Sequence, residues 1–169
     1  NRNYLTTISG NILTDGNKVN VTIEDAFENI DDDGNTTNPD YDYKTISSDD
    51  EFLTAVNTPG KYVVISDLHI AKEGDTVTTL ATRAGGATTT IDLNGKTITV
   101  ENKGTGALVS VAADKTLVLA GAGKIIMTEE STASFIDNNN ANGGVIIEQA
   151  KVINNSTSDD AKVVEGKVI

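Results

Sequence analysis

Apolar residues recur every 27 positions between residues 88 and 169, and this period constrains the fold more than any other feature of the chain. Three separate series keep it: Ile91, Val118 and Val145; Ile98, Ile125 and Val152; and Val109, Ile136 and Val163. Self-similarity at a fixed period of roughly 20–50 residues is the signature of repeat architectures, in which each repeat stacks on its neighbour. The sequence therefore predicts a stacked repeat in this region rather than isolated strands.

Each repeat contains three short apolar segments that are typical of β-strands. Two of them flank a break of about three residues, in TIDLNGKTITV (90–100), LVLAGAGKIIM (117–127) and GVIIEQAKVIN (144–154). A third follows at 107–112, 133–137 and 161–166. Three strands per period, each stacked on its equivalent one turn earlier, predict an all-β fold: a parallel β-helix of triangular cross-section. We expect it to be right-handed, as parallel crossovers almost always are. The alternative, a β-sandwich, has no reason to keep a 27-residue register.

Alternation within the strands predicts which side chains fill the interior. The expected inward residues are Ile91, Leu93, Ile98, Val100, Val109 and Val111. The expected outward residues are Asp92, Thr97, Thr99 and Ser110. An aliphatic interior suits the composition, because aromatic residues make up 4% of the chain and tryptophan is absent. The narrow core of a solenoid needs less aromatic volume than a globular core does.

A helix is predicted at 49–57, where it would cover the N-terminal end of the stack. Ser48 is the expected N-cap, and Glu51 follows three residues later as in a capping box. The apolar face would be formed by Phe52, Leu53 and Val56. At the other end the sequence VVEGKVI stops inside a coil. We therefore expect either the native chain to continue past Ile169 or a neighbouring subunit to cover this edge.

The chain divides into an N-terminal arm with an acidic linker (1–43) and the β-helix domain (44–169). Residues 1–60 hold 12 acidic and 3 basic side chains, and residues 61–169 hold 13 and 10. The formal net charge of the whole chain is −12. Such a surface repels phosphate backbones and anionic lipids, so the sequence predicts neither a nucleic-acid partner nor a membrane partner.

The acidic linker contains a candidate calcium site. Asn29, Asp31, Asp33, Gly34 and Asp40 match positions 1, 3, 5, 6 and 12 of a calcium-binding loop. Hard cations prefer several carboxylate oxygens from one tight turn, and glycine lets the backbone fold back. Position 1 is Asn rather than Asp and position 12 is Asp rather than Glu, which favours the alternative of a solvated acidic linker. We expect no other cofactor.

The sequence predicts no catalytic cluster. A β-helix enzyme that cleaves polysaccharides would need carboxylates beside a base on one strand face, or paired Asp and Glu residues across a cleft. In the 27-residue alignment Lys124 and Lys151 stack without a carboxylate column beside them, and Asp137 and Glu165 fall one residue out of register. His69 is the only histidine, and alternation predicts that it faces outward without a partner. We therefore expect a protein that is not an enzyme.

Residues 45–100 resemble the start of pectate-lyase-like right-handed parallel β-helix domains. The shared features, in order, are a capping helix (SSDDEFLTAV), a Pro-Gly turn, an apolar strand (KYVVISDLHI) and the string IDLNGKTIT. The segment DLNGKTIT at 92–99 is similar to the first regular coil of many bacterial surface proteins and of phage tailspikes, fibres and head-decoration proteins. The resemblance implies the fold and is not specific for an activity.

The sequence favours a non-enzymatic structural protein of a phage virion: a head fibre, a capsid decoration or a tail fibre. Residues 1–43 would bind a capsid or tail protein, and the β-helix would project outward for host attachment. The resemblance implies a homotrimer, and the outward apolar residues Ile126 and Ile153 would fit an assembly interface. The alternatives are an extracellular bacterial adhesin or module that binds cell-surface glycan, and a polysaccharide-degrading enzyme.

Overall fold

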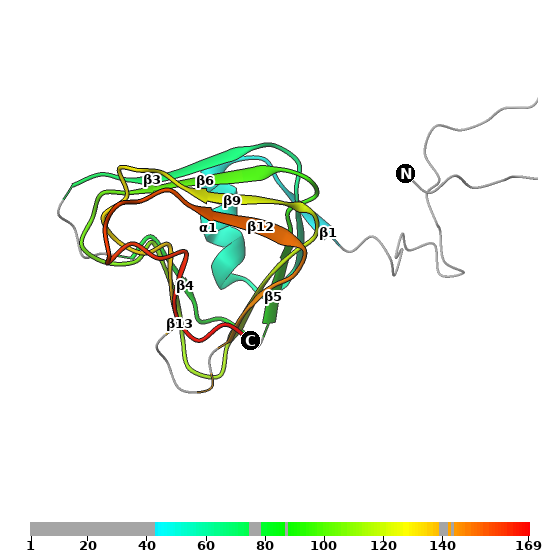
Figure 1. The fold of residues 1–169 in the computed structure, drawn as a ribbon. Coiled ribbons are helices and arrows are strands. Elements are labelled where there is room, and N and C mark those ends of the chain that lie inside the picture. The colour runs from blue at the N-terminus through cyan, green and yellow to red at the C-terminus, as the bar shows by residue number, and fades with distance from the viewer. Residues whose placement is uncertain (1–42, 75–78, 87, 139–141, 143) are drawn as a thin grey trace, which may run out of the picture. The chain divides into compact units, whose positions relative to one another are not determined.

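The structure is a computed structural model that describes residues 43–74, 79–86, 88–138, 142 and 144–169. These residues form a parallel β-solenoid with about 28 residues per coil, and the all-β prediction is confirmed. In Figure 1 three sheets outline a triangle, and one short helix lies across its interior. The predicted arm up to residue 42 lies outside the described residues, as do the candidate calcium ligands Asn29, Asp31, Asp33 and Asp40.

Each side of the triangle is one parallel sheet. The first sheet contains β1 (Tyr43–Ile46), β2 (Gly60–Val64), β5 (Thr88–Asp92), β8 (Thr116–Ala120) and β11 (Gly144–Ile147). The second contains β3 (Leu68–Lys72), β6 (Thr97–Asn102), β9 (Gly123–Met127) and β12 (Ala150–Asn154). The third contains β4 (Ala81–Arg83), β7 (Val109–Val111), β10 (Ile136–Asn138) and β13 (Val164–Gly166). Each coil therefore adds one strand to every sheet.

The interior is the aliphatic core that alternation predicted. All six residues expected to face inward are fully buried: Ile91, Leu93, Ile98, Val100, Val109 and Val111. The residues expected to face outward are half-buried: Asp92, Thr97, Thr99 and Ser110. Because successive side chains of a strand point to opposite faces, the local pattern was sufficient to assign them.

The constant 27-residue period is wrong for two of the three series. In the first sheet Ile91 pairs with Leu119, 28 positions later, and Val118 pairs with Thr90 and is only half-buried. In the third sheet Val109 and Ile136 are paired as expected, but Ile136 then pairs with Val164 rather than Val163. The second sheet keeps the predicted period, since its three series members pair in register: Ile98, Ile125 and Val152.

The corners explain why the period varies. The corner between the first and second sheets runs from Ile91 to Ile98, then from Leu119 to Ile125, then from Ile147 to Val152. It therefore shortens by one residue at each coil. Pairing must keep apolar side chains inward, and a slip of one residue would turn every side chain of a strand to the other face. The same alternation of inward and outward side chains is therefore kept in every strand, and the corners change in length from coil to coil.

These corners rely on left-handed backbone. In the second coil Asn94 and Gly95 have φ values of 49° and 75°, and in the next coil Gly121 has a φ of 75°. A Cβ atom on Gly121 would collide with the carboxylate of Asp92, which accepts a hydrogen bond from the Asn94 N–H at 2.8 Å. Glycine is therefore required at position 121 both by its φ angle and by the close approach of Asp92.

Helix α1 (Asp49–Asn57) closes the first coil, as predicted. Ser48 is its N-cap and accepts a hydrogen bond from the Glu51 N–H at 3.3 Å. The carboxylate of Glu51 in turn accepts hydrogen bonds from the N–H and the hydroxyl of Ser47, and these bonds lower the pKa of Glu51. The helix buries Phe52, whose ring lies 6.3 Å from that of Phe135 in the third coil. The side chain of Phe52 therefore reaches into the interior of the solenoid and packs beside a residue of the third coil.

A buried arginine ties this cap to the coils. Arg83 is fully buried at the end of β4; its Nη1 donates to the Asn57 carbonyl and its Nε to the Thr116 carbonyl, each at 3.2 Å. Burial lowers the pKa of Arg83, because desolvation disfavours the charged form. The two hydrogen bonds join the end of α1 to the start of β8.

Candidate functional site: a polar corner of the solenoid

Among the described residues, polar side chains with hydrogen-bond or ion-pair partners are concentrated at the corner between the second and third sheets. Its loops connect β6 to β7, β9 to β10 and β12 to β13. Hydroxyl groups of one loop donate to carbonyl groups of the preceding loop: Thr132 to Gly104 at 3.0 Å, Ser156 to Ser131 at 2.5 Å and Ser158 to Thr132 at 3.3 Å. These bonds satisfy loop backbone that the strand ladders do not reach.

Asn102 and Lys72 fix the floor of this corner. Asn102 is fully buried; its Nδ2 donates to the carbonyls of Gly106 and Ser134 at 2.9 and 2.8 Å, and its Oδ1 accepts from the Gly104 N–H. Lys72 is also buried and donates from Nζ to the same Gly106 carbonyl at 3.3 Å. Burial lowers the pKa of Lys72. Hydrogen bonds from the side chains of Asn102 and Lys72 therefore hold the loop from 104 to 107 in place.

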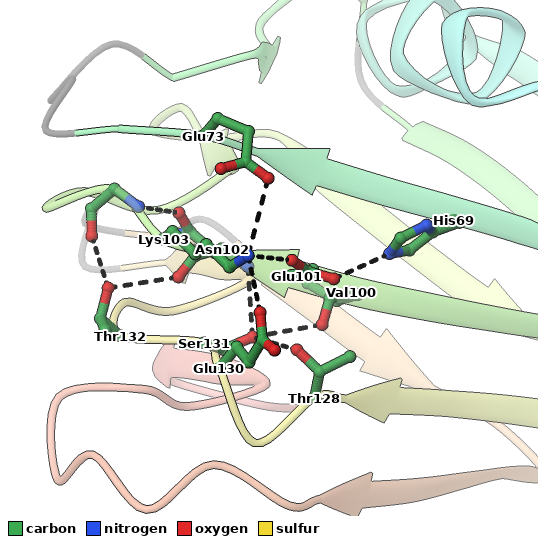
Figure 2. Close-up of polar contacts among 11 residues, drawn as sticks. His69, Glu73, Val100, Glu101, Asn102, Lys103, Thr128, Glu130, Ser131 and Thr132 are labelled. Atoms are coloured by element: carbon green, nitrogen blue, oxygen red, sulfur yellow. Dashed lines mark hydrogen bonds and ion pairs between the residues drawn. The ribbon is translucent and has the colours of Figure 1, made fainter.

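On the outer side of the corner, one lysine contacts three carboxylates (Figure 2). The Nζ of Lys103 lies 2.6 Å from Glu101, 2.6 Å from Glu130 and 3.7 Å from Glu73. Hydrogen bonds to Glu101 and Glu130 raise the pKa of Lys103, and the bond to Lys103 lowers the pKa of Glu101. Glu73 follows β3, Glu101 lies near the end of β6 and Glu130 follows β9, so this cluster links three successive coils.

His69 belongs to the same cluster. Its side chain is 56% exposed, which confirms the predicted outward orientation, but the expectation that it has no partner is wrong. Its Nε2 lies 3.3 Å from Oε2 of Glu101 (Figure 2). The register between β3 and β6 places His69 opposite Thr99, and Glu101 lies two residues further along the same face. Long side chains reach such diagonal neighbours.

A groove with a volume of about 370 Å³ lies at the same corner. It is lined by residues 104–107 and 132–134, which we call its floor, and by Asp160, Lys162 and Glu165, which we call its wall. The Ser134 hydroxyl organises this wall: it lies 3.1 Å from the Asp160 carbonyl and 3.4 Å from Oε2 of Glu165, and it accepts from the Lys162 N–H at 3.2 Å. Ser134 itself is buried.

A column of polar side chains continues from the groove along the third sheet. Glu165 pairs in register with Asp137, which pairs with Ser110, and Ser110 pairs with Thr82. The expectation that Asp137 and Glu165 fall out of register is therefore wrong. It assumed a spacing of 27 residues, whereas β10 and β13 are offset by 28. The structure brings these two carboxylate residues onto neighbouring strands of one face.

Two other predicted columns lie on the second sheet. Lys151 pairs with Lys124, which pairs with Thr97, as expected. Ile153 pairs with Ile126, and both side chains are half-buried on the outer face. Neither column contributes a residue to the groove.

Comparisons with protein-family models, with curated proteins and with solved structures each gave no match. The parallel β-solenoid is therefore established by the structure itself, and the resemblance to pectate-lyase-like domains stays a prediction. Within the part of the chain that the structure describes, no group of three or more His, Cys, Asp or Glu side chains could hold a metal ion. Across those same residues, no helix has the length and hydropathy needed to cross a membrane.

Sequence reasoning missed the Lys103 cluster, although the signal was present. Lys103 and Glu130 are 27 positions apart, the spacing of the best-kept apolar series, so the period itself places them side by side. The groove offered no comparable signal. Its lining comes from loops of unequal length, and only the packing of those loops brings Asp160, Lys162 and Ser134 together.

Proposed function

We propose that this protein is a non-enzymatic structural protein that projects from a surface, with a phage virion fibre or decoration protein as the leading candidate. The observation that supports this proposal is the difference between the two ends of the solenoid. Helix α1 covers the first coil, so that Leu68 is 4% exposed. Val152 occupies the equivalent position in the last described coil and is 42% exposed. Within the described residues, α1 covers the first coil, whereas no further strand pairs with β12.

This polarity suits a module that projects in one direction. The chain enters the stack at β1, next to the closed end, where α1 buries its apolar face against the first coil. At the open end β12 and β13 are the last strands of their sheets within the described residues, and β12 presents the inward-facing side chain of Val152 to whatever stacks on it. Under this proposal residues 1–43 bind a capsid or tail protein at the base, and the coils form the shaft.

The location of the protein tests this proposal. Antibodies raised against the full chain are used in immunogold electron microscopy of the cells that produce it and of the virus particles they release. We expect label on virus particles. Label on the cell envelope instead would favour the bacterial adhesin, and label confined to the cell interior would overturn both assignments. Deleting residues 1–43 should remove the label from the particle while the β-solenoid still folds.

The homotrimer is part of the same proposal, and the column of Ile126 and Ile153 supports it. Both residues face outward, and apolar side chains that are stacked on an outer face mark interaction surfaces. Light scattering should give a trimer for the full chain and a monomer for Ile153→Lys. Lys151→Ala, on the same strand, is the control and should remain a trimer. A monomeric unmodified chain would overturn this part of the proposal.

A polysaccharide-degrading enzyme is the second candidate, and the register of Asp137 and Glu165 favours it. Neighbouring strands are about 4.8 Å apart, which can bring two carboxyl groups to the separation of about 5–5.5 Å that retaining glycosidases use. This enzyme would release reducing ends from a polysaccharide, and Asp137→Asn and Glu165→Gln would each abolish the release. Equal activity in both variants and the unmodified chain would exclude this pair as the catalytic residues.

A further inference from the structure

We infer that the groove at the corner between the second and third sheets binds a neutral saccharide. This inference goes beyond the structural role proposed above, because it states what the projecting module would recognise. It rests on the size, the lining and the charge of the groove, each of which is independent of where the protein is located.

The size of the groove fits a small sugar. Its volume of about 370 Å³ falls in the range of roughly 300–1,000 Å³ that is typical of small-molecule sites. The groove therefore accommodates a monosaccharide unit together with a few bound waters, but not a folded peptide.

The lining of the groove matches the hydroxyl groups of a sugar. Glu165 offers carboxylate oxygens as acceptors, and Lys162 offers an ammonium group that forms no ion pair within the described residues. The exposed Thr105 adds a hydroxyl group, Thr132 adds a hydroxyl that already donates to the Gly104 carbonyl and can still accept, and the loop from 104 to 107 adds backbone groups. A sugar presents neighbouring hydroxyls that both donate and accept, so it can use both kinds of partner at once.

The wall of the groove is held in place before a ligand binds. Oε2 of Glu165 lies 3.4 Å from the Ser134 Oγ and shares its single hydrogen with the nearer Asp160 carbonyl, so the second carboxylate oxygen remains for a hydroxyl of the ligand. The same hydroxyl is held between the Asp160 carbonyl and the Lys162 N–H. Because Ser134 is buried, solvent competes little for these bonds. The backbone of the wall is therefore ordered before binding, and only the exposed side chains of Asp160 and Lys162 have to be ordered by the ligand.

The charge of the groove selects neutral sugars over acidic ones. Asp160 and Glu165 carry two negative charges against the single positive charge of Lys162. The chain as a whole carries a formal charge of −12. A uronate or a sialic acid would therefore meet repulsion both at the wall and from the surrounding field. A neutral hexose or N-acetylhexosamine meets neither.

The column beside the groove extends the site along the stack. Asp137 and Ser110 follow Glu165 on neighbouring strands, about 4.8 Å apart at each step. A glycan that leaves the groove along this column meets one hydrogen-bonding side chain at every coil. We expect longer neutral oligosaccharides to bind more tightly than the single sugar.

Amide chemical shifts test the inference directly. The ¹⁵N-labelled full chain is titrated with glucose, galactose, mannose, rhamnose and N-acetylglucosamine, and separately with glucuronate. At least one neutral sugar should shift the amide signals of Gly104, Gly106 and Ala133, and glucuronate should shift them less. If none of the neutral sugars moves these signals, or if glucuronate moves them most, the inference is wrong.

Two matched variants locate the site. Glu165→Gln should weaken binding about tenfold, because a hydrogen bond to a charged group is replaced by one to a neutral group. Glu148→Gln removes the same charge from an exposed position outside the groove and should leave binding unchanged. Equal effects of the two variants would show that only the overall charge matters, and would overturn the inference.

A third variant fills the groove. Ala107 lines it and is half-buried, so Ala107→Phe should abolish binding without removing a polar partner. Its melting temperature and its remaining amide signals report whether the solenoid is intact. If the solenoid is intact and sugar binding persists, the sugar binds elsewhere and the inference fails. These titrations use the chain in solution, so they can fail while the immunogold result stands, and the reverse also holds.

Discussion

One column of inward side chains runs through the second sheet and is covered differently in the first and the last described coil. Leu68, Ile98, Ile125 and Val152 are consecutive members of this column in the second sheet. The two central residues are fully buried, Leu68 is 4% exposed under α1, and Val152 is 42% exposed. All four have the same parity and the same kind of side chain. An inward side chain in this fold is therefore buried only when another coil or the helix packs on top of it. The alternation within a strand decides only which side chains face inward.

The largest effect is expected at the closed end. Phe52→Ala removes a fully buried ring and should lower the free energy of unfolding by about 4 kcal/mol, through lost burial and the cavity that remains. Urea denaturation followed by circular dichroism measures this loss. Leu53→Ala, on the same helix but half-buried, is the control and should cost clearly less. Equal losses would mean that α1 does not close the core through Phe52.

The same substitution at a central and a terminal coil compares the layers directly. Val100→Ala, at a fully buried position, should cost about 2 kcal/mol, whereas Val152→Ala at the open end should cost less than about 1 kcal/mol. Urea denaturation of the isolated chain measures both losses in the free energy of unfolding. In an assembly that covers the open end, the cost of Val152→Ala should rise towards that of Val100→Ala. A terminal substitution as costly as the central one in the monomer would contradict the layer argument.

The cap of α1 should contribute less than its buried ring. Ser48→Ala removes the acceptor of the Glu51 N–H and should lower the free energy of unfolding by about 1 kcal/mol. Ser48→Asp keeps an acceptor at this position and should retain most of the stability. Thermal unfolding of the three proteins gives the comparison. A loss in Ser48→Asp that equals the loss in Ser48→Ala would exclude the capping hydrogen bond as the cause.

The smallest effect concerns pH and the cluster on the outer side of the corner. Lys103 lowers the pKa of Glu101 in the folded state below its ordinary value of 4.5. The contribution of the ionised Glu101 to the free energy of unfolding is therefore fully present above pH 4.5, and it is lost as the pH falls through the pKa of Glu101 in the folded state. The melting temperature should fall less steeply below this pH in Glu101→Gln than in the unmodified chain. Glu148→Gln should follow the unmodified chain, and a flattened profile in this control would contradict the assignment.

Much of the fold could be predicted from the sequence because its signals are local. Alternation assigned inward residues such as Ile91 and Val109, and the capping box located α1. The register between coils is not a local property. Val118 was predicted to stack on Ile91, but the corner between the first two sheets changes length from coil to coil, and Leu119 takes that place. A prediction that assumes a fixed period cannot include such changes in corner length, so it assigns the wrong neighbours between coils.

The candidate site was less predictable than the fold, and for the same reason. The Lys103 cluster follows the period, since Lys103 and Glu130 are one coil apart, and a search for charged residues at that spacing would have found it. The groove depends on three loops of different lengths. The pairing of Asp137 with Glu165 depends on one additional residue between β10 and β13. Neither the groove nor this pairing can be predicted from a repeat whose length is assumed to be constant.

The sequence by itself determined the class of fold, the parity of each strand and the closure of the first coil. These follow from alternating side chains, from left-handed turn residues and from a helix cap, all of which act over a few residues. Only the tertiary structure decided which residues of different coils are neighbours, because pairing between coils depends on the lengths of the corners. It placed Glu165 beside Asp137 and gathered Lys162 and Ser134 around one groove.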